Sequence, residues 1–216
     1  MSSLRAEFRN YVRATSTPCM MARAAERFDR VEINDYGCLG SDSASSALYR
    51  DIEQYVLRGS RRPFQFESFI SVFKQTSIQS EREFESELWR QLQKLHRLDE
   101  YPWDSAVRND PESANFSFSV AGAAFYVVGL HPRSSRASRR FKYPAIAFNY
   151  HRQFEELKTV GKFERVKAQI RRNDQAENGS INPMLEDFGE SSEARQYSGR
   201  SVEQTWTCPV DLAEDR

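Results

Sequence analysis

The residue types best suited to chemistry gather where an apolar run ends. His131 follows the run 123–130, and four arginines come next within eight residues, with no acid among them. A guanidinium fork binds a carboxylate or phosphate group through two parallel hydrogen bonds. The cluster therefore favours an anion clamp, while a solvated basic loop and nucleic-acid binding are the alternatives. The four arginines are Arg133, Arg136, Arg139 and Arg140.

A second polar group accompanies the end of the apolar run 144–150 and includes Asn149, His151 and Glu155. The junction between a strand and a helix exposes side chains and free backbone N–H groups. His151 and Glu155 are four residues apart, so they share one face of a helix. That pair is compatible with metal binding but supplies fewer ligands than a zinc site needs. The alternative is that Asn149 caps the helix and His151 lies on the surface.

Two of the three cysteines, Cys19 and Cys208, adjoin a proline. Thr17 is a suitable N-cap, which places the Cys19 thiol in a first helical turn, where free N–H groups favour the thiolate. A thiolate is a strong haem ligand. The alternative for each cysteine is a buried structural thiol. Cys38 is given no role, and His96, on the apolar face of a helix, is predicted to be a core histidine.

Composition limits the partners and the location that we expect. Lys and Arg number 31 and Asp and Glu number 31, so the net charge gives no reason to expect a nucleic-acid or membrane partner. No apolar run approaches the roughly 20 residues of a membrane span, and the first residues contain no apolar signal core. We therefore expect a cytoplasmic protein of one domain, residues 1–216.

Hydrophobic periodicity predicts the elements that must position these residues. A hairpin is expected around Gly122, a capping box at Ser80–Glu83 opens a helix, and Gly161 breaks another. The mixture of helices and consecutive strands indicates an α+β fold with a mainly antiparallel mixed sheet packed by helices. The expected strands are 31–33, 64–73, 116–120, 123–130 and 144–150. The expected helices are 18–28, 44–57, one from 81 onward, and 155–174.

The stretch from Asn173 to Pro209 has no clear periodicity and is predicted to be a long irregular C-terminal segment. Segments of this kind are usually functional or disordered. Large apolar residues spaced along it favour an anchored, functional segment. These residues are Met184, Leu185, Phe188, Tyr197 and Trp206.

Several long and unusual motifs together resemble the YqcI/YcgG family. The resemblance covers roughly Thr17 to Pro209 and therefore nearly the whole chain. Its motifs include GLHPRSSRASRRF at 129–141, FNYHRQFEELK at 148–158, GSINPMLEDFGESSEARQYSGR at 179–200 and WTCP at 206–209.

Characterised relatives in that family are haem-dependent N-oxygenases. The resemblance implies a monooxygenase that uses haem and O₂ to hydroxylate a guanidine nitrogen. The substrate would be arginine or an arginine-derived cyclic guanidine amino acid, and electrons would come from an external donor. A homo-oligomer is left open. A non-catalytic haem-binding or redox-sensing protein and a soluble anion-binding module are the alternatives.

Residue by residue, the resemblance implies an axial haem ligand among two cysteines and two histidines. Cys19 is preferred, because a helix N-terminus favours a thiolate; Cys208, His131 and His151 are the alternatives. The basic motif would suit the haem propionates, through Arg136, Arg139 and Arg140.

The same resemblance implies the residues on the substrate side. Glu155 is expected opposite the substrate guanidinium, which a carboxylate pairs through two hydrogen bonds. His151 and Asn149 are expected beside it. The long C-terminal motif is expected to close the pocket, through Asn182, Glu193, Arg195 and Tyr197.

Overall fold

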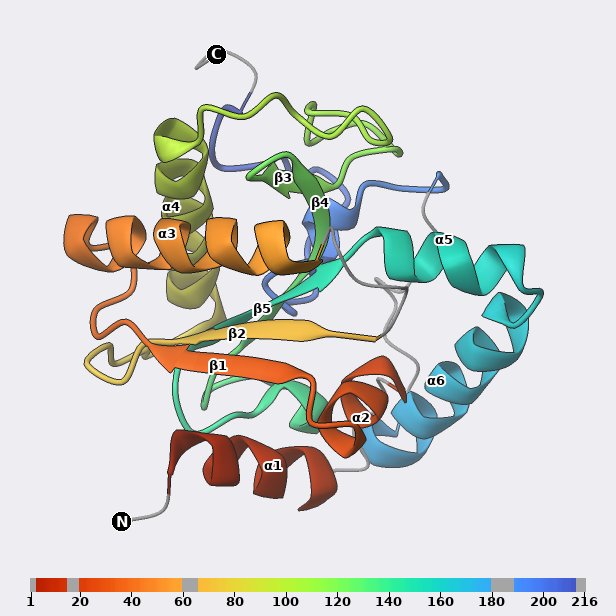
Figure 1. The fold of residues 1–216 in the computed structure, drawn as a ribbon. Coiled ribbons are helices and arrows are strands. Elements are labelled where there is room, and N and C mark those ends of the chain that lie inside the picture. Colours follow the sequence, from red (N-terminus) through yellow and green to blue (C-terminus); the bar gives the residue numbers. More distant parts are fainter. Residues whose placement is uncertain (1–2, 15–19, 60–65, 180–188, 213–216) are drawn as a thin grey trace.

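A five-stranded mixed sheet lies between two layers of helices in the computed structural model (Figure 1). The structure describes residues 3–14, 20–59, 66–179 and 189–212. The strand order is β1-β2-β5-β4-β3; the β1–β2 pair is parallel and the other three pairs are antiparallel. The predicted α+β class with a mainly antiparallel mixed sheet is confirmed. The strands are β1 (Val31–Asp35), β2 (Ser68–Val72), β3 (Phe118–Val120), β4 (Ala123–Leu130) and β5 (Ala145–Tyr150).

Six α-helices are described, and they pack on both faces of the sheet (Figure 1). Successive strand residues point to opposite faces, so each strand serves two cores. Phe69 and Phe148 belong to the core under α3 and α4, whereas Ile70 and Ala147 belong to the core over α1 and α2. No described helix is long and apolar enough to cross a membrane. The helices are α1 (Leu4–Ala14), α2 (Met20–Arg27), α3 (Asp42–Gly59), α4 (Glu81–Leu98), α5 (Arg152–Thr159) and α6 (Phe163–Asn178).

Local signals in the sequence set several of these boundaries. Ser80 caps α4 by accepting a hydrogen bond from the Glu83 N–H at 3.1 Å, as the capping box predicts. Gly161, with φ of 67°, separates α5 from α6. Ala121 and Gly122 both have positive φ in the turn that joins β3 to β4, which is the geometry of a tight hairpin.

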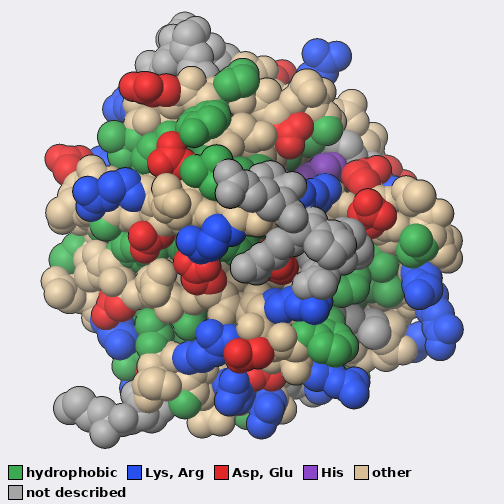
Figure 2. All heavy atoms as spheres, in the orientation of Figure 1, with side chains coloured by type: hydrophobic (Ala, Val, Ile, Leu, Met, Phe, Trp, Pro, Cys, Tyr) green, Lys and Arg blue, Asp and Glu red, His purple; other side chains and the backbone are tan. Residues whose placement is uncertain are grey.

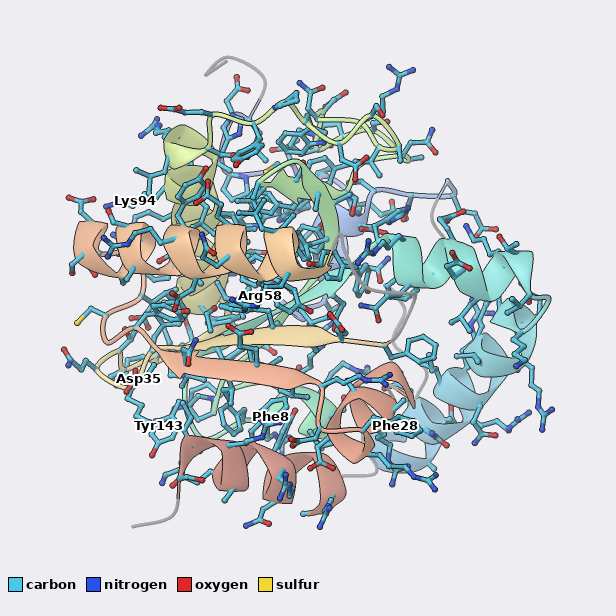
Figure 3. The ribbon with its side chains drawn as sticks, in the orientation of Figure 1. Phe8, Phe28, Asp35, Arg58, Lys94 and Tyr143 are labelled. Carbon is cyan, nitrogen blue, oxygen red and sulfur yellow. The ribbon has the colours of Figure 1, made fainter. Side chains whose placement is uncertain are left out.

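Helix α1 was not predicted, and it covers the lower face of the sheet. Its sequence is mostly polar, but Phe8 and Val12 lie one turn apart and are buried. Figure 3 shows Phe8 between α1 and the sheet, where it contacts Phe141 edge to face at 5.6 Å. Residues 18–19 and 64–65, the starts of two predicted elements, lie outside the described residues.

Charged side chains of both signs are interspersed on the face shown in Figure 2. Several form surface ion pairs that join neighbouring elements. Arg58 of α3 meets Glu32 of β1 at 2.7 Å, and Arg5 of α1 meets Asp29 at 2.6 Å. Exposed pairs of this kind contribute about 0–1 kcal/mol each, so the two cores carry most of the stability.

The C-terminal segment, residues 189–212, docks beside β4. It has one regular turn, the 3-10 helix η2 (Glu193–Gln196), so this part of the segment is irregular as predicted. The predicted start at Asn173 is wrong, because α6 continues to Asn178. Strand β3 pairs only with 123–125 of β4. Beyond that point the Gly129 N–H donates to the Tyr197 carbonyl at 2.7 Å. The segment therefore takes the place of a neighbouring strand at this edge.

A Gly129→Ala substitution should destabilise the fold through this contact. A Cβ at position 129 would lie 2.5 Å from Phe84 Cε1 and 2.8 Å from the Tyr197 carbonyl oxygen. Relieving this overlap should cost about 2–3 kcal/mol of unfolding free energy, measured by urea denaturation. Gly161→Ala is the control: it meets no neighbour within 4 Å, so it should cost only about 1 kcal/mol from its positive φ. Equal losses in the two variants would contradict the role of this contact.

Candidate functional site

The two histidine motifs lie at opposite ends of the sheet. Strands β4 and β5 are antiparallel and pair Phe125 with Tyr150 at one end and Leu130 with Ala145 at the other. His131 follows the end of β4 and His151 follows the end of β5. The register places His131 and His151 seven residues apart along the strands, which at a rise of about 3.4 Å per residue is roughly 24 Å. The two histidines that were candidate ligands of one haem therefore lie in two separate regions.

His131 lies in the core. It is fully buried and stacks on the Phe84 ring, with ring centroids 4.3 Å apart. Within the described part of the chain neither of its ring nitrogens has a hydrogen-bond partner. Burial lowers its pKa from 6.5 to about 4 because desolvation penalises the charged imidazolium. The side chain is therefore a neutral imidazole at neutral pH.

The arginines expected to bind haem propionates bond the protein instead. Arg136 donates to Asp174 of α6 at 2.7 Å, and the Asp174 side chain is almost completely buried. Arg139 donates to the carbonyl oxygens of Gly129 at 3.1 Å and Gln196 at 3.3 Å. Arg140 donates to two carbonyl oxygens of its own loop, at 2.7 and 2.8 Å. The basic motif thus holds its loop against α6, β4 and the C-terminal segment.

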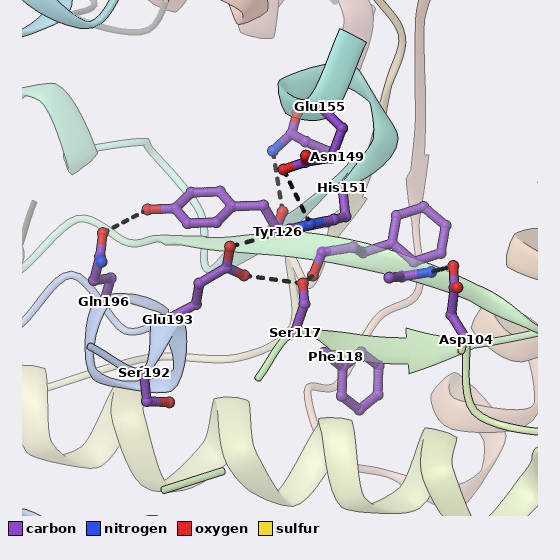
Figure 4. Close-up of polar contacts among 12 residues, drawn as sticks. Asp104, Ser117, Phe118, Tyr126, Asn149, His151, Glu155, Ser192, Glu193 and Gln196 are labelled. Atoms are coloured by element: carbon purple, nitrogen blue, oxygen red, sulfur yellow. Dashed lines mark hydrogen bonds and ion pairs between the residues drawn. The ribbon is translucent and has the colours of Figure 1, made fainter. Parts of the chain in front are cut away.

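At the other end, His151 lies between two carboxylates (Figure 4). Its Nε2 atom is 3.7 Å from Glu155 Oε1, and its Nδ1 atom is 3.7 Å from Glu193 Oε1. The residue is 4% exposed. It occupies the N-cap position of α5 without making a side-chain cap bond. The interpretation of His151 as a surface residue is therefore wrong.

Asn149 supports this region from within the sheet. Its side-chain oxygen accepts a hydrogen bond from the Ser68 hydroxyl at 2.7 Å, and its amide donates to the Tyr126 carbonyl at 3.3 Å. The side chain thus joins β5 to β2 and β4. The suggestion that Asn149 caps α5 is wrong, because these bonds hold its amide in the sheet.

Glu193 is the buried member of the group. It is 5% exposed, and its Oε2 atom accepts hydrogen bonds from the Ser117 hydroxyl at 2.9 Å and the Tyr197 hydroxyl at 3.4 Å. Burial raises the pKa of this carboxyl group. The sequence predicted that Glu193 belongs to a segment that closes the pocket, but it did not predict which residue Glu193 contacts. Its contact with His151 joins parts of the chain far apart in sequence, which spacing alone does not indicate.

The neighbours of Glu193 fix the position of η2. Tyr197 is fully buried and its hydroxyl accepts the Phe118 N–H at 2.9 Å, while Gln196 accepts the Tyr126 hydroxyl at 2.8 Å. Arg195 donates to the carbonyl oxygens of Trp206 and Glu203. These hydrogen bonds fix the segment around η2, and the segment places Glu193 next to His151.

The arrangement is suited to proton transfer and to cation binding. It contains Ser, His and Glu, but the Ser117 hydroxyl donates to Glu193 and not to the imidazole, so it does not form a nucleophilic triad. Glu155 differs from Glu193 in exposure. Its side chain is 48% exposed and pairs with Lys158 at 2.8 Å. One carboxylate thus faces solvent while the other is held inside.

Of the two cysteines that the resemblance suggests as haem ligands, the structure describes Cys208. Burial, with Glu112 and Asp211 nearby, raises the pKa of the Cys208 thiol to about 12, so a thiolate is disfavoured there. The described residues contain no cluster of three or more His, Cys, Asp or Glu side chains that could hold a metal ion. Cys19, the preferred ligand, lies outside the described residues, as does Asn182.

His96 is placed as predicted. It is 1% exposed, on the inner side of α4, and meets the Trp103 ring edge to face at 5.7 Å.

The protein should become less stable as the pH falls, because His131 must be protonated while it is buried. Its folded-state pKa is depressed, so the unfolded chain binds more protons between pH 6.5 and about 4. The contribution is complete above pH 6.5 and declines as pH falls to about 4, by about 3 kcal/mol at 1.36 kcal/mol per pKa unit. His131→Leu should lose less stability than the wild type over this range, as measured by urea denaturation at several pH values. Parallel curves for the two proteins would rule out this coupling.

Comparison with known proteins gives the chain a family. The sequence profile of the YqcI/YcgG family matches residues 8–211. The chain is also 25% identical over 215 residues to the uncharacterized protein YcgG of Bacillus subtilis (strain 168), covering 94% of this chain and 83% of that protein. No solved structure matches at comparable significance. Because the profile spans most of its length, the chain belongs to the YqcI/YcgG family.

Proposed function

We propose that the protein is a cytoplasmic, haem-dependent monooxygenase that hydroxylates a guanidine nitrogen of arginine or of an arginine-derived cyclic guanidine amino acid. The observation that carries the substrate assignment is the pair of carboxylates, Glu155 and Glu193, on either side of His151. Family membership supports the proposal through the resemblance of the motifs around these residues.

A guanidinium group suits this end of the sheet. It carries a positive charge and a planar set of N–H donors, which a carboxylate binds through two hydrogen bonds. Glu155 is accessible, and its present partner is the partly exposed side chain of Lys158. A substrate guanidinium can replace that ammonium group, because a surface ion pair of this kind contributes only about 0–1 kcal/mol. Glu155 is therefore the proposed substrate carboxylate.

Haem, when bound, would supply the activation of O₂. The overall reaction takes two electrons from an external donor and two protons, and gives the N-hydroxylated guanidine and water. Cys19 would hold the haem iron through its thiolate. The protein's own residues would bind and orient the guanidine and exclude water around it. Asn149 would act indirectly, because its bonds to β2 and β4 fix the end of β5 that carries His151.

Reconstitution with haem tests the cofactor. The wild type should take up haem and show a Soret band. Its ferrous–CO spectrum should be that of a thiolate complex, because thiolate and imidazole ligation differ in this spectrum. Cys19→Ser should lose the thiolate signature, and Cys208→Ser, the matched control, should keep it. Wild-type protein that takes up no haem would sink the proposal.

Titration with arginine and related guanidines tests the substrate site. A guanidine bound near the haem should shift the Soret band. Glu155→Gln should weaken that binding by roughly 10- to 100-fold, the equivalent of a charged hydrogen bond of about 1.5–3 kcal/mol. Glu156→Gln is the control, because Glu156 is the neighbouring exposed carboxylate on α5, and adjacent residues point to different faces of a helix. Haem uptake without any guanidine response in the wild type would indicate the non-catalytic haem binder instead.

A further inference from the structure

We propose that His151 and Glu193 form an acid–base dyad, in which Glu193 holds the imidazole as its Nδ1–H tautomer and leaves Nε2 as the working atom beside Glu155. This proposal adds an acid–base pair to the proposed function, and it takes the identity of the substrate from that function. Glu193 is the positioning residue of the pair, and His151 is the group that exchanges a proton.

The two carboxylates compete unequally for the imidazole N–H. Glu155 is solvated, and it already accepts a hydrogen bond from Lys158 at 2.8 Å. Glu193 is shielded from water, and its contacts there are with neutral hydroxyl groups and His151. A hydrogen bond to a buried carboxylate is stronger, because the local dielectric is low and water does not compete. The single proton of a neutral imidazole is therefore favoured on Nδ1.

Glu193 is fixed well enough to orient the ring. Ser117 and Tyr197 both donate to its Oε2 atom, which leaves Oε1 directed at His151. The His151 N–H donates to the Ala124 carbonyl oxygen at 2.9 Å, which fixes the backbone of the histidine. Both imidazole–carboxylate distances, at 3.7 Å, exceed a hydrogen bond, and such contacts often tighten only when substrate binds.

The dyad has a task in guanidine hydroxylation. A guanidinium nitrogen has no free lone pair, so an N–H bond must break as the N–O bond forms. The proton would pass to His151 Nε2, and Glu193 would stabilise the resulting imidazolium. Transfer from a resting guanidinium to an imidazole is strongly unfavourable, because a guanidinium is a much weaker acid than an imidazolium. We therefore place the transfer during N–O bond formation, when the electronegative oxygen lowers the basicity of the nitrogen.

Nitrogen-15 NMR of the protein without haem or substrate tests the dyad directly. The chain has three histidines, and loss of one set of ring signals in His151→Gln assigns this one. In the alkaline range, where an imidazole ordinarily carries one proton, the wild type should show His151 protonated on Nδ1. A proton on Nε2 would overturn the proposal without the need for any further variant.

Two matched variants separate the carboxylates. Glu193→Gln should raise the Nε2–H population about tenfold, because a neutral amide no longer favours Nδ1–H. Glu155→Gln should leave the Nδ1–H tautomer in place. The same tautomer populations in Glu193→Gln and in the wild type would contradict the dyad.

Kinetics with the haem-loaded enzyme then separates positioning from substrate binding. Glu193→Gln should lower kcat by about 10²-fold or more with little change in KM, whereas Glu155→Gln should mainly raise KM. A raised KM with unchanged kcat in Glu193→Gln would place Glu193 in the guanidinium site and overturn the dyad. Protein that takes up no haem but keeps the Nδ1–H tautomer would sink the proposed function and leave the dyad standing.

Discussion

The candidate site depends on the docking of residues 193–200 against the free edge of β4. Strand β3 is too short to pair with all of β4, so the backbone groups near Gly129 need other partners. A buried N–H or C=O without a partner costs about 1–3 kcal/mol. The Tyr197 carbonyl accepts the Gly129 N–H, and Arg139 donates to the Gly129 carbonyl, so both groups are satisfied. The same contact fixes the register that places Glu193 next to His151.

A buried ion pair holds the other end of this segment. Arg200 donates to Glu85 of α4 at 2.8 and 2.9 Å, and Ser198 donates to the other carboxylate oxygen. Replacing such a pair by apolar residues can be neutral in stability, but removing one partner leaves an unpaired buried charge. We infer that the pair contributes mainly to specificity, because it admits one register of the segment on α4. The motif SEARQYSGR, residues 192–200, therefore docks this segment. Within it, Glu193 directs its Oε1 atom toward His151.

The sequence predicted most helices and strands, but it did not predict which ends of the strands lie close together in the fold. Periodicity and turn chemistry are local, so the cap at Ser80 and the break at Gly161 were correct. The position of His131 relative to His151 depends on whether β4 and β5 run parallel or antiparallel, and both runs end in polar groups either way. Helix α1 was not predicted, because its sequence is mostly polar and it buries few apolar residues. The structural role of Arg139 was not predicted, because its acceptors are backbone carbonyl oxygens. Every residue has such an oxygen, so the sequence does not indicate which ones will be bonded.

The two glutamates show how burial divides roles among identical side chains. In water two unit charges 4 Å apart interact by about 1 kcal/mol, and the interaction grows several-fold where the effective dielectric falls. Glu155 at the surface can therefore exchange one cation for another at little cost, which a substrate carboxylate must do. Glu193 in the interior cannot release its partners cheaply, which suits a residue that must hold one imidazole in one tautomer. Because η2 brings Glu193 to the site and the Gly129–Tyr197 contact holds η2, the acid–base chemistry proposed here is tied to the packing of β4. The stability of that edge and the orientation of His151 are thus set by the same few hydrogen bonds.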